Sequence, residues 1–196
     1  MIIVTSANGI VGLMFVYLTL GIWSIMIVYW LVAARINSQT SFVSEIFSFL
    51  KLIGSSLLIY LQLLIGGELA TRLYPDNLWF DIAGALVSAL GVGLAIWSRV
   101  VLGNNWSGRV MVQKVHTIVK EGPYGLVRHP IYLGGILAMV GSCLVLGQVF
   151  GFVYVALSIF GLVRKSKQEE TLLAEQFPDE YPQYKRQVSM LVPFLY

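Results

Sequence analysis

Long apolar stretches separated by short polar ones dominate the chain, and their lengths predict membrane-spanning helices. A helix needs about 20 apolar residues to cross roughly 30 Å of hydrocarbon. Residues 10–34 meet this length. Residues 52–67 form a shorter run, which extends back toward residue 47, and residues 80–97 form a third. This pattern predicts three spanning helices in the first half of the chain.

The longest apolar run, residues 131–163, contains no charged residue and is too long for one span. Gly147 and Gln148 interrupt it near its middle. We therefore expect a tight hairpin of two short or tilted helices. The whole pattern predicts an all-α integral membrane protein with about five transmembrane helices.

Composition supports this class. Of the 196 residues, 57% are hydrophobic and 12% are charged, and the mean hydropathy is +0.78. Soluble domains carry about 25% charged residues. The single cysteine, Cys143, lies in an apolar run, so no intrachain disulfide or cysteine-based zinc or redox motif is expected. The N-terminus lacks the basic region of a signal peptide, and we expect the first helix to be retained.

The distribution of Lys and Arg predicts the orientation in the membrane. With the N-terminus outside and the C-terminus in the cytoplasm, twelve of the 13 basic residues lie on the cytoplasmic side. Only Arg72 falls outside, in a loop that also carries acidic residues. This asymmetry follows the positive-inside rule. Contact with membrane lipid headgroups explains several of these cations but not their concentration in two segments.

Those two segments are the loop of residues 103–129 and the tail of residues 164–196. The loop has no obvious long helix, and loops of that length are usually functional or disordered. The tail begins with a charged helix and continues as a segment rich in tyrosine and proline. Because both lie on the predicted cytoplasmic face, we expect them to close over one site there.

The join between the loop and the hairpin reads GPYGLVRHPIYLGGIL. Proline is well tolerated at the first position of a helix, so Pro130 is predicted to begin the fourth helix. The free N–H groups of that first turn, with Arg128 and His129 beside them, favour binding of an anionic group. Tyr124 and Tyr132 offer flat faces for a nucleobase or a cation. The alternative, that these residues only mark the membrane interface, stays open at this point.

The tail supplies the opposite charge. Glu169 and Glu170 follow Arg164, Lys165 and Lys167, and Lys165 and Glu169 are neighbours at i,i+4 spacing on a helix. A surface pair of this kind contributes little in isolation. Its position just after the fifth helix allows it to face the loop.

These residues resemble the signature of the isoprenylcysteine carboxyl methyltransferase family. The resemblance rests on HTIVKEGPYGLVRHPIYLG, on the upstream LGNNWS and on the downstream EQFPDEYPQY with the terminal VPF. It covers about residues 102–194, whereas the first three helices match only in being helices. We therefore expect residues 1–101 to form N-terminal helices and residues 102–196 to form a methyltransferase core. Related lipid methyltransferases and some sterol reductases share a similar core.

The resemblance implies a carboxyl methyltransferase that uses S-adenosylmethionine, bound by the cytoplasmic loop, the start of the next helix and the acidic helix of the tail. It also implies that Lys165, or its neighbour Arg164, faces the methyl acceptor. Arg128 joins the cofactor-binding set through the argument on anionic groups. The expected cofactor-binding residues are Gln113, His116, Thr117, Ile118, Val119, Tyr124, Arg128, His129, Pro130, Ile131, Tyr132 and Glu169.

One position departs from the family pattern. Four residues before the glutamate the family has an arginine, whereas this chain has Lys165. Lysine keeps the charge but loses the bidentate fork that grips a carboxylate. The expected partner is a lipophilic or prenylated small molecule or peptide, with other amphiphiles left open, and no nucleic acid.

Methyl transfer to a carboxylate is an in-line displacement that requires positioning and exclusion of water. The carboxylate is already ionised at pH 7, so no general base is needed. His116, His129, Glu169 and Glu170 lack the spacing of a metal site, and no metal is predicted.

Two other functions compete with this interpretation. A membrane reductase using NADPH would need a dinucleotide fingerprint, and Gly91 and Gly93 form a poor one because they lie within an apolar span. A small transporter or interaction protein is the non-enzymatic alternative. Against it, no span carries a central ionisable residue of the kind that marks an ion path.

Overall fold

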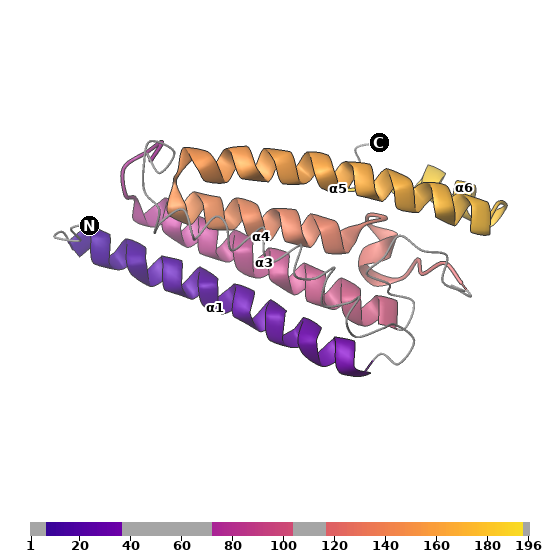
Figure 1. Ribbon diagram of the computed structural model, residues 1–196, viewed down its shortest axis with the longest axis horizontal. Coiled ribbons are helices and arrows are strands. Elements are labelled where there is room, and N and C mark those ends of the chain that lie inside the picture. The colour runs from indigo at the N-terminus through magenta and orange to yellow at the C-terminus, as the bar shows by residue number, and fades with distance from the viewer. Residues whose placement is uncertain (1–6, 37–71, 104–116, 194–196) are drawn as a thin grey trace.

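The computed structural model describes residues 7–36, 72–103 and 117–193, and this part of the chain is built from helices (Figure 1). Four long helices lie lengthwise beside one another. A short 3-10 helix and the last helix lie at one end of this bundle. The elements are α1 (Ala7–Ile36), α3 (Leu78–Leu102), η3 (Gly122–Gly125), α4 (Pro130–Leu146), α5 (Val149–Gln176) and α6 (Glu180–Gln187).

Three of these helices, α1, α3 and α5, are long and apolar enough to cross a membrane, and α4 is a shorter apolar helix of 17 residues. The predicted fold class, an all-α integral membrane protein, is confirmed. The span predicted at residues 52–67 lies outside the described residues. The division into residues 1–101 and 102–196 stays a prediction.

The break predicted within the long apolar run is confirmed. Helix α4 ends at Leu146, and α5 begins at Val149 after two residues. Gly147 adopts a left-handed conformation with φ 64°, and its N–H donates to the carbonyl of Cys143 at 2.7 Å. A glycine tolerates this φ because it has no Cβ. The carbonyl of Gly147 in turn accepts a hydrogen bond from the N–H of Leu73 at 2.8 Å, which ties the hairpin to the segment before α3.

Helices α3 and α4 pack with their backbones in contact. A Cβ added at Gly91 would lie 2.4 Å from the amide nitrogen of Ala138 and 2.5 Å from the carbonyl oxygen of Gly134. Small residues at helix interfaces permit this close approach in membranes. Gly91 therefore serves helix packing, which accounts for a glycine that also suggested a weak dinucleotide motif. The hydroxyl of Ser88 adds a hydrogen bond across the interface, to the carbonyl of Ala138 at 3.1 Å.

Helix α1 covers the α3–α4 pair with large side chains. Trp23, Met26 and Trp30 are buried in the core of the bundle. The indole N–H of Trp23 donates to the hydroxyl of Ser142 on α4 at 3.0 Å. This buried hydrogen bond satisfies the one polar group of the indole and fixes α1 against α4.

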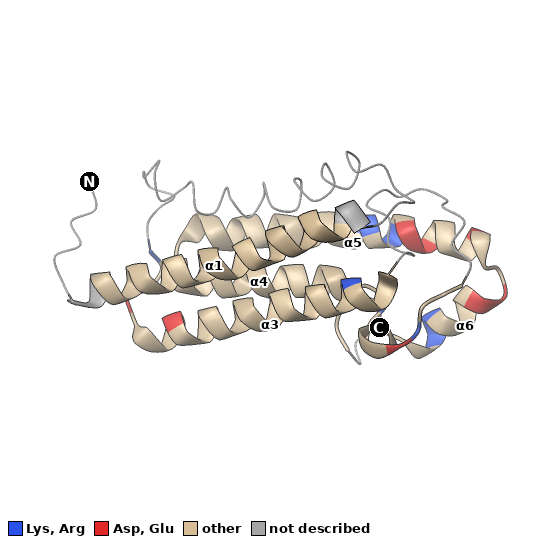
Figure 2. Ribbon diagram, turned by 90° about the horizontal axis from the view of Figure 1, so that it is seen from below, with Lys and Arg blue, Asp and Glu red and all other residues tan. Residues whose placement is uncertain are grey.

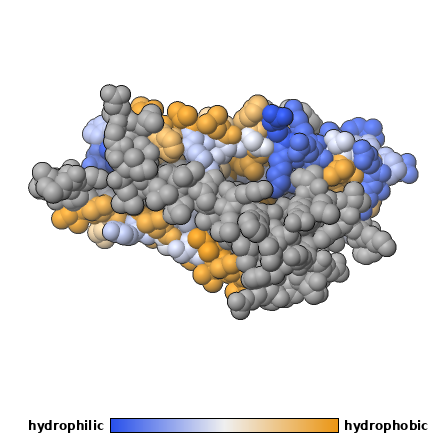
Figure 3. Space-filling model, viewed as in Figure 1, coloured by the Kyte–Doolittle hydropathy of each residue, from blue (hydrophilic) through white to orange (hydrophobic). Residues whose placement is uncertain are grey.

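Charged and apolar residues are segregated along the bundle. Acidic and basic residues gather around the end that carries α6 (Figure 2). Hydrophobic residues cover much of the visible helix surface, and the most hydrophilic ones lie at that same end (Figure 3). Apolar side chains exposed in this way are suited to contact with lipid. They include Leu86, Leu90, Trp97, Leu157 and Phe160.

Candidate functional site

The loop before α4 is held by the end of the chain. Two backbone hydrogen bonds join them, from the N–H of Arg128 to the carbonyl of Ser189 at 2.8 Å and from the N–H of His129 to the carbonyl of Met190 at 3.1 Å. We call residues 188–191 the C-terminal segment. Pro130 is the first residue of α4, as predicted from its position after the loop. The C-terminal segment therefore lies alongside the residues that lead into this helix.

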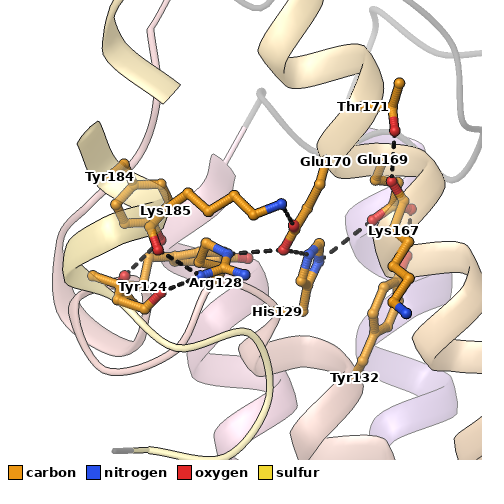
Figure 4. Close-up of polar contacts among 11 residues, drawn as sticks. Tyr124, Arg128, His129, Tyr132, Lys167, Glu169, Glu170, Thr171, Tyr184 and Lys185 are labelled. Atoms are coloured by element: carbon orange, nitrogen blue, oxygen red, sulfur yellow. Dashed lines mark hydrogen bonds and ion pairs between the residues drawn. The ribbon is translucent and has the colours of Figure 1, made fainter. Parts of the chain in front are cut away.

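Helix α5 continues beyond its apolar part, residues 149–163, as a charged extension at residues 164–176. This extension lies beside the start of α4 (Figure 4). The Glu169 Oε1 atom accepts a hydrogen bond from the Tyr132 hydroxyl at 2.5 Å and lies 3.9 Å from the Lys165 Nζ atom. The Lys165 Nζ atom lies 5.2 Å from the centroid of the Tyr132 ring. The structure thus brings the tail onto the loop–helix junction.

The neighbouring glutamate occupies a more buried position. Glu170 has a side chain that is 4% exposed, and its Oε1 atom accepts a hydrogen bond from Arg128 Nε at 2.8 Å. Its Oε2 atom lies 2.9 Å from Lys185 Nζ on α6. The imidazole of His129 lies between the two glutamates, with Nδ1 3.5 Å from Glu169 Oε2 and Nε2 3.4 Å from Glu170 Oε1. One histidine therefore faces both carboxylates.

Burial and ion pairing act in opposite directions on Glu170. Burial favours the neutral acid and would raise its pKa. Hydrogen bonds from His129, Arg128 and Lys185 outweigh this effect and lower the pKa from 4.5 to about 2. Glu170 therefore stays ionised throughout the physiological range.

Two buried tyrosines, Tyr124 and Tyr184, lie beside Arg128. The hydroxyl of Tyr184 donates to the carbonyl of Tyr124 at 2.6 Å, which attaches α6 to η3. Burial is the main cause that raises the pKa of both tyrosines above its ordinary value. Both side chains therefore stay neutral. The hydroxyl of Tyr181 is also buried, without a hydrogen-bond partner.

The structure separates the two cations that were expected to face the acceptor. Lys165 reaches the Tyr132 ring, as described above. Arg164 is exposed, and its guanidinium lies 5.7 Å from the ring of Phe160, one turn earlier on α5. Of the two, Lys165 is therefore the cation that belongs to the cluster around Glu169.

The other predicted cofactor residues are more dispersed. Gln113 and His116 lie outside the described residues. Thr117 is exposed, Ile118 and Val119 are half-buried, and Ile131 is buried. Their roles in cofactor binding stay predictions.

Two side chains at the centre of this site were not in the predicted set. The sequence names Glu170 only as the acidic neighbour of Glu169 and as an unsupported metal ligand, and it counts Lys185 only among the basic residues of the predicted cytoplasmic face. The signal for Glu170 was its position beside Glu169, but only the fold shows that it faces Arg128. Within the described residues, no group of three or more His, Cys, Asp or Glu side chains is arranged to hold a metal ion.

Comparison with known proteins finds a family match that covers part of this site. Residues 85–175 match the model of the isoprenylcysteine carboxyl methyltransferase family. The protein-S-isoprenylcysteine O-methyltransferase of Rattus norvegicus is 32% identical over 121 residues, which are 60% of this chain and 42% of the relative. The enzyme of the same name from Saccharomyces cerevisiae is 32% identical over 137 residues, which are 63% of this chain and 56% of the relative.

A bacterial relative carries a different name. The cobalt-zinc-cadmium resistance protein CzcN of Cupriavidus metallidurans is 31% identical over 122 residues, which are 61% of this chain and 54% of the relative. The chain spans about half the length of the curated relatives it matches. The matched region includes α4 and most of α5, with Tyr132, Lys165 and both glutamates.

Proposed function

We propose that this chain, which belongs to the isoprenylcysteine carboxyl methyltransferase family, transfers a methyl group from S-adenosylmethionine to the carboxylate of a lipophilic acceptor. The observation that carries the proposal is the cluster of Tyr132, Lys165 and Glu169 at the end of the apolar helices. This cluster lies within the family region, and it combines a cation, a carboxylate and an aromatic face.

The residues of the cluster fit S-adenosylmethionine. This molecule carries two positive groups, a carboxylate, ribose hydroxyls and an adenine. Glu169, with a side chain that is 23% exposed, can accept hydrogen bonds from the amino or hydroxyl groups. The Nε2 atom of His129 is buried and lies 3.4 Å from Glu170 Oε1. The ring of Tyr132 provides a flat surface for a cation.

When bound, S-adenosylmethionine supplies an electrophilic methyl group, which moves to an acceptor carboxylate oxygen while the sulfur keeps the electron pair of the broken bond. An ionised acceptor gives up no proton, so the protein needs no general base. Lys165 is placed to orient a negative acceptor, since its ammonium group lies over Tyr132 and beside Glu169. Methyl transfer also requires that water be excluded from the reacting groups, and the apolar helices lie next to the cluster.

The acceptor is proposed as a class: an amphiphile with an apolar tail and a free carboxylate, such as a prenylcysteine. Lysine at position 165 is a point charge, which selects a carboxylate less strictly than an arginine does. One relative is named for metal resistance and not for a prenylcysteine, so the proposed acceptor class includes other amphiphilic carboxylates. The names of the eukaryotic relatives favour the prenylcysteine.

We also propose that the site faces the cytoplasm. Among the described residues, Arg72 lies at the hairpin end of the bundle, where it pairs with Gln148, and the remaining Lys and Arg lie toward the α6 end. This distribution is the one that the positive-inside rule associates with a cytoplasmic face. Labelling of a cysteine introduced at Lys120 tests it in sealed vesicles or cells, and labelling from the same side as a cysteine at Arg72 would overturn it.

The activity is tested with purified protein in detergent and labelled S-adenosylmethionine. We expect transfer to an N-acylated, S-prenylated cysteine, with a product that releases methanol in base because it is a methyl ester. The same compound with its carboxylate converted to an amide is the matched control and should stay unlabelled. The proposal would be contradicted if no methyl group were transferred to the prenylated cysteine or to a fatty acid. Binding of NADPH in place of S-adenosylmethionine in calorimetry would also contradict it.

A further inference from the structure

Glu170 differs from Glu169 in how its carboxylate is used. Both of its oxygens contact cations of this chain, since Oε1 accepts from Arg128 and Oε2 pairs with Lys185. At 4% exposed, the side chain has almost no surface left for a ligand. Glu169 is more exposed and contacts Tyr132 and Lys165. The two adjacent glutamates therefore cannot play the same part.

The cations that Glu170 holds come from two separate places in the chain. Arg128 and His129 precede α4, whereas Lys185 belongs to α6 near the end of the protein. Figure 4 shows the carboxylate of Glu170 between Arg128 on one side and His129 on the other, with the end of the Lys185 side chain beside it. A single charge on α5 thus joins the start of α4 to α6.

The guanidinium of Arg128 extends this connection. Its Nη1 atom donates to the carbonyls of Lys185, at 3.1 Å, and of Val188. The same residues, Arg128 and His129, also donate their backbone N–H groups to the C-terminal segment. The guanidinium that donates to Glu170 is therefore the same one that donates to α6 and to the C-terminal segment.

We propose that Glu170 is a positioning residue, which acts through Arg128 and His129 and ties the C-terminal segment to the site. This inference rests on the proposed function, since it describes how that site is assembled. His129 shares its two ring nitrogens between Glu169 and Glu170, so loss of one carboxylate leaves the ring free to turn toward the other. The geometry for bound ligand would then be lost without removal of any group that touches the ligand.

The principal test uses Glu170→Gln, which keeps the shape of the side chain and removes its charge, with Glu175→Gln as matched control. Glu175 is an exposed residue of the same helix. In ligand-free protein we expect hydrogen exchange of residues 185–193 to become about 10-fold faster or more in Glu170→Gln, since hydrogen bonds to charged groups are among the stronger ones. The control should exchange as the parent does.

Ligand binding and turnover separate positioning from general stability. The folded fraction of Glu170→Gln should bind S-adenosylhomocysteine about 10-fold more weakly, and its kcat should fall by roughly 100-fold, the loss that a misplacement of 1 Å can cause. A purely structural role would reduce the amount of folded protein and leave its Kd unchanged. An unchanged Kd in the folded fraction therefore overturns the proposal.

Lys185 provides a second variant in case Glu170→Gln does not fold. Its side chain is 54% exposed, so Lys185→Met should be tolerated. We expect Lys185→Met to accelerate exchange of residues 185–193, with a smaller effect on Kd because Arg128 keeps its pair, and Lys185→Arg to restore both. No change in exchange with Lys185→Met contradicts the proposal. Failure of the parent to bind S-adenosylhomocysteine instead contradicts the proposed function, while the exchange experiment still decides whether Glu170 ties the segment.

Discussion

Replacement of Gly91 by alanine tests the packing on which the position of α4 depends. The added Cβ would meet only backbone atoms, the amide nitrogen of Ala138 at 2.4 Å, the carbonyl oxygen of Gly134 at 2.5 Å and the carbonyl carbon of Leu137 at 3.0 Å. Backbone atoms cannot rotate away as the end of a flexible side chain can. The helices must therefore separate, by about 1 Å, to bring the shortest contact from 2.4 Å to the 3.4 Å of an ordinary one.

The expected cost follows from this overlap. Overpacking of a close interface typically costs about 1–3 kcal/mol. For a chain of this size, 1 kcal/mol corresponds to a change of roughly 2–4 °C in Tm. We expect Gly91→Ala to lower the Tm of the detergent-solubilised protein by about 2–12 °C, measured by the change in helical circular dichroism or tryptophan fluorescence.

Gly93 provides the matched control on the same helix. A Cβ added there meets nothing within 4 Å, and the residue is exposed. Alanine favours a helix over glycine by roughly 0.5–1 kcal/mol, so Gly93→Ala should leave Tm unchanged or raise it. If Gly91→Ala melts at or above the parent temperature, the backbones of α3 and α4 are not in contact at this point and the packing argument is refuted.

Three further predictions concern single groups. Ser142→Ala should lower the free energy of unfolding by about 1–3 kcal/mol, as measured by thermal or denaturant unfolding, because the buried indole N–H of Trp23 loses its acceptor. Lys165→Ala should reduce methyl transfer far more than Arg164→Ala in steady-state kinetics, since only Lys165 contacts Tyr132 and Glu169, and equal effects would contradict that assignment. The lowered pKa of Glu170 contributes stability that is fully present above about pH 4.5 and is lost as the pH falls toward 2, so the difference in Tm between the parent and Glu170→Gln should be constant above pH 4.5 and shrink below it.

The helices could be predicted from the sequence because the requirement for crossing a membrane applies to each apolar segment separately. A backbone in hydrocarbon must satisfy its own hydrogen bonds, so a long apolar run has one available structure. The interruption at Gly147 and Gln148 could also be predicted, because it divides an apolar run that is too long for one span. The contact between α3 and α4 could not be predicted, since the sequence around Gly91 does not indicate which helix packs against it.

The contacts within the site were equally hard to predict, because their partners come from separate parts of the chain. Successive residues of a helix point about 100° apart, since a turn contains 3.6 residues. Glu169 and Glu170 therefore face different elements, although a sequence presents them as one acidic pair. The family motif and the i,i+4 spacing predicted that Glu169 and Lys165 are partners, because both lie on one helix. The partners of Glu170 come from before α4 and from α6, and only the hairpin and the return of the C-terminal segment bring them to one carboxylate. Loss of the Glu170 charge should therefore loosen residues 185–193, which lie beyond the end of α5, and the sequence of the acidic pair alone does not account for that effect.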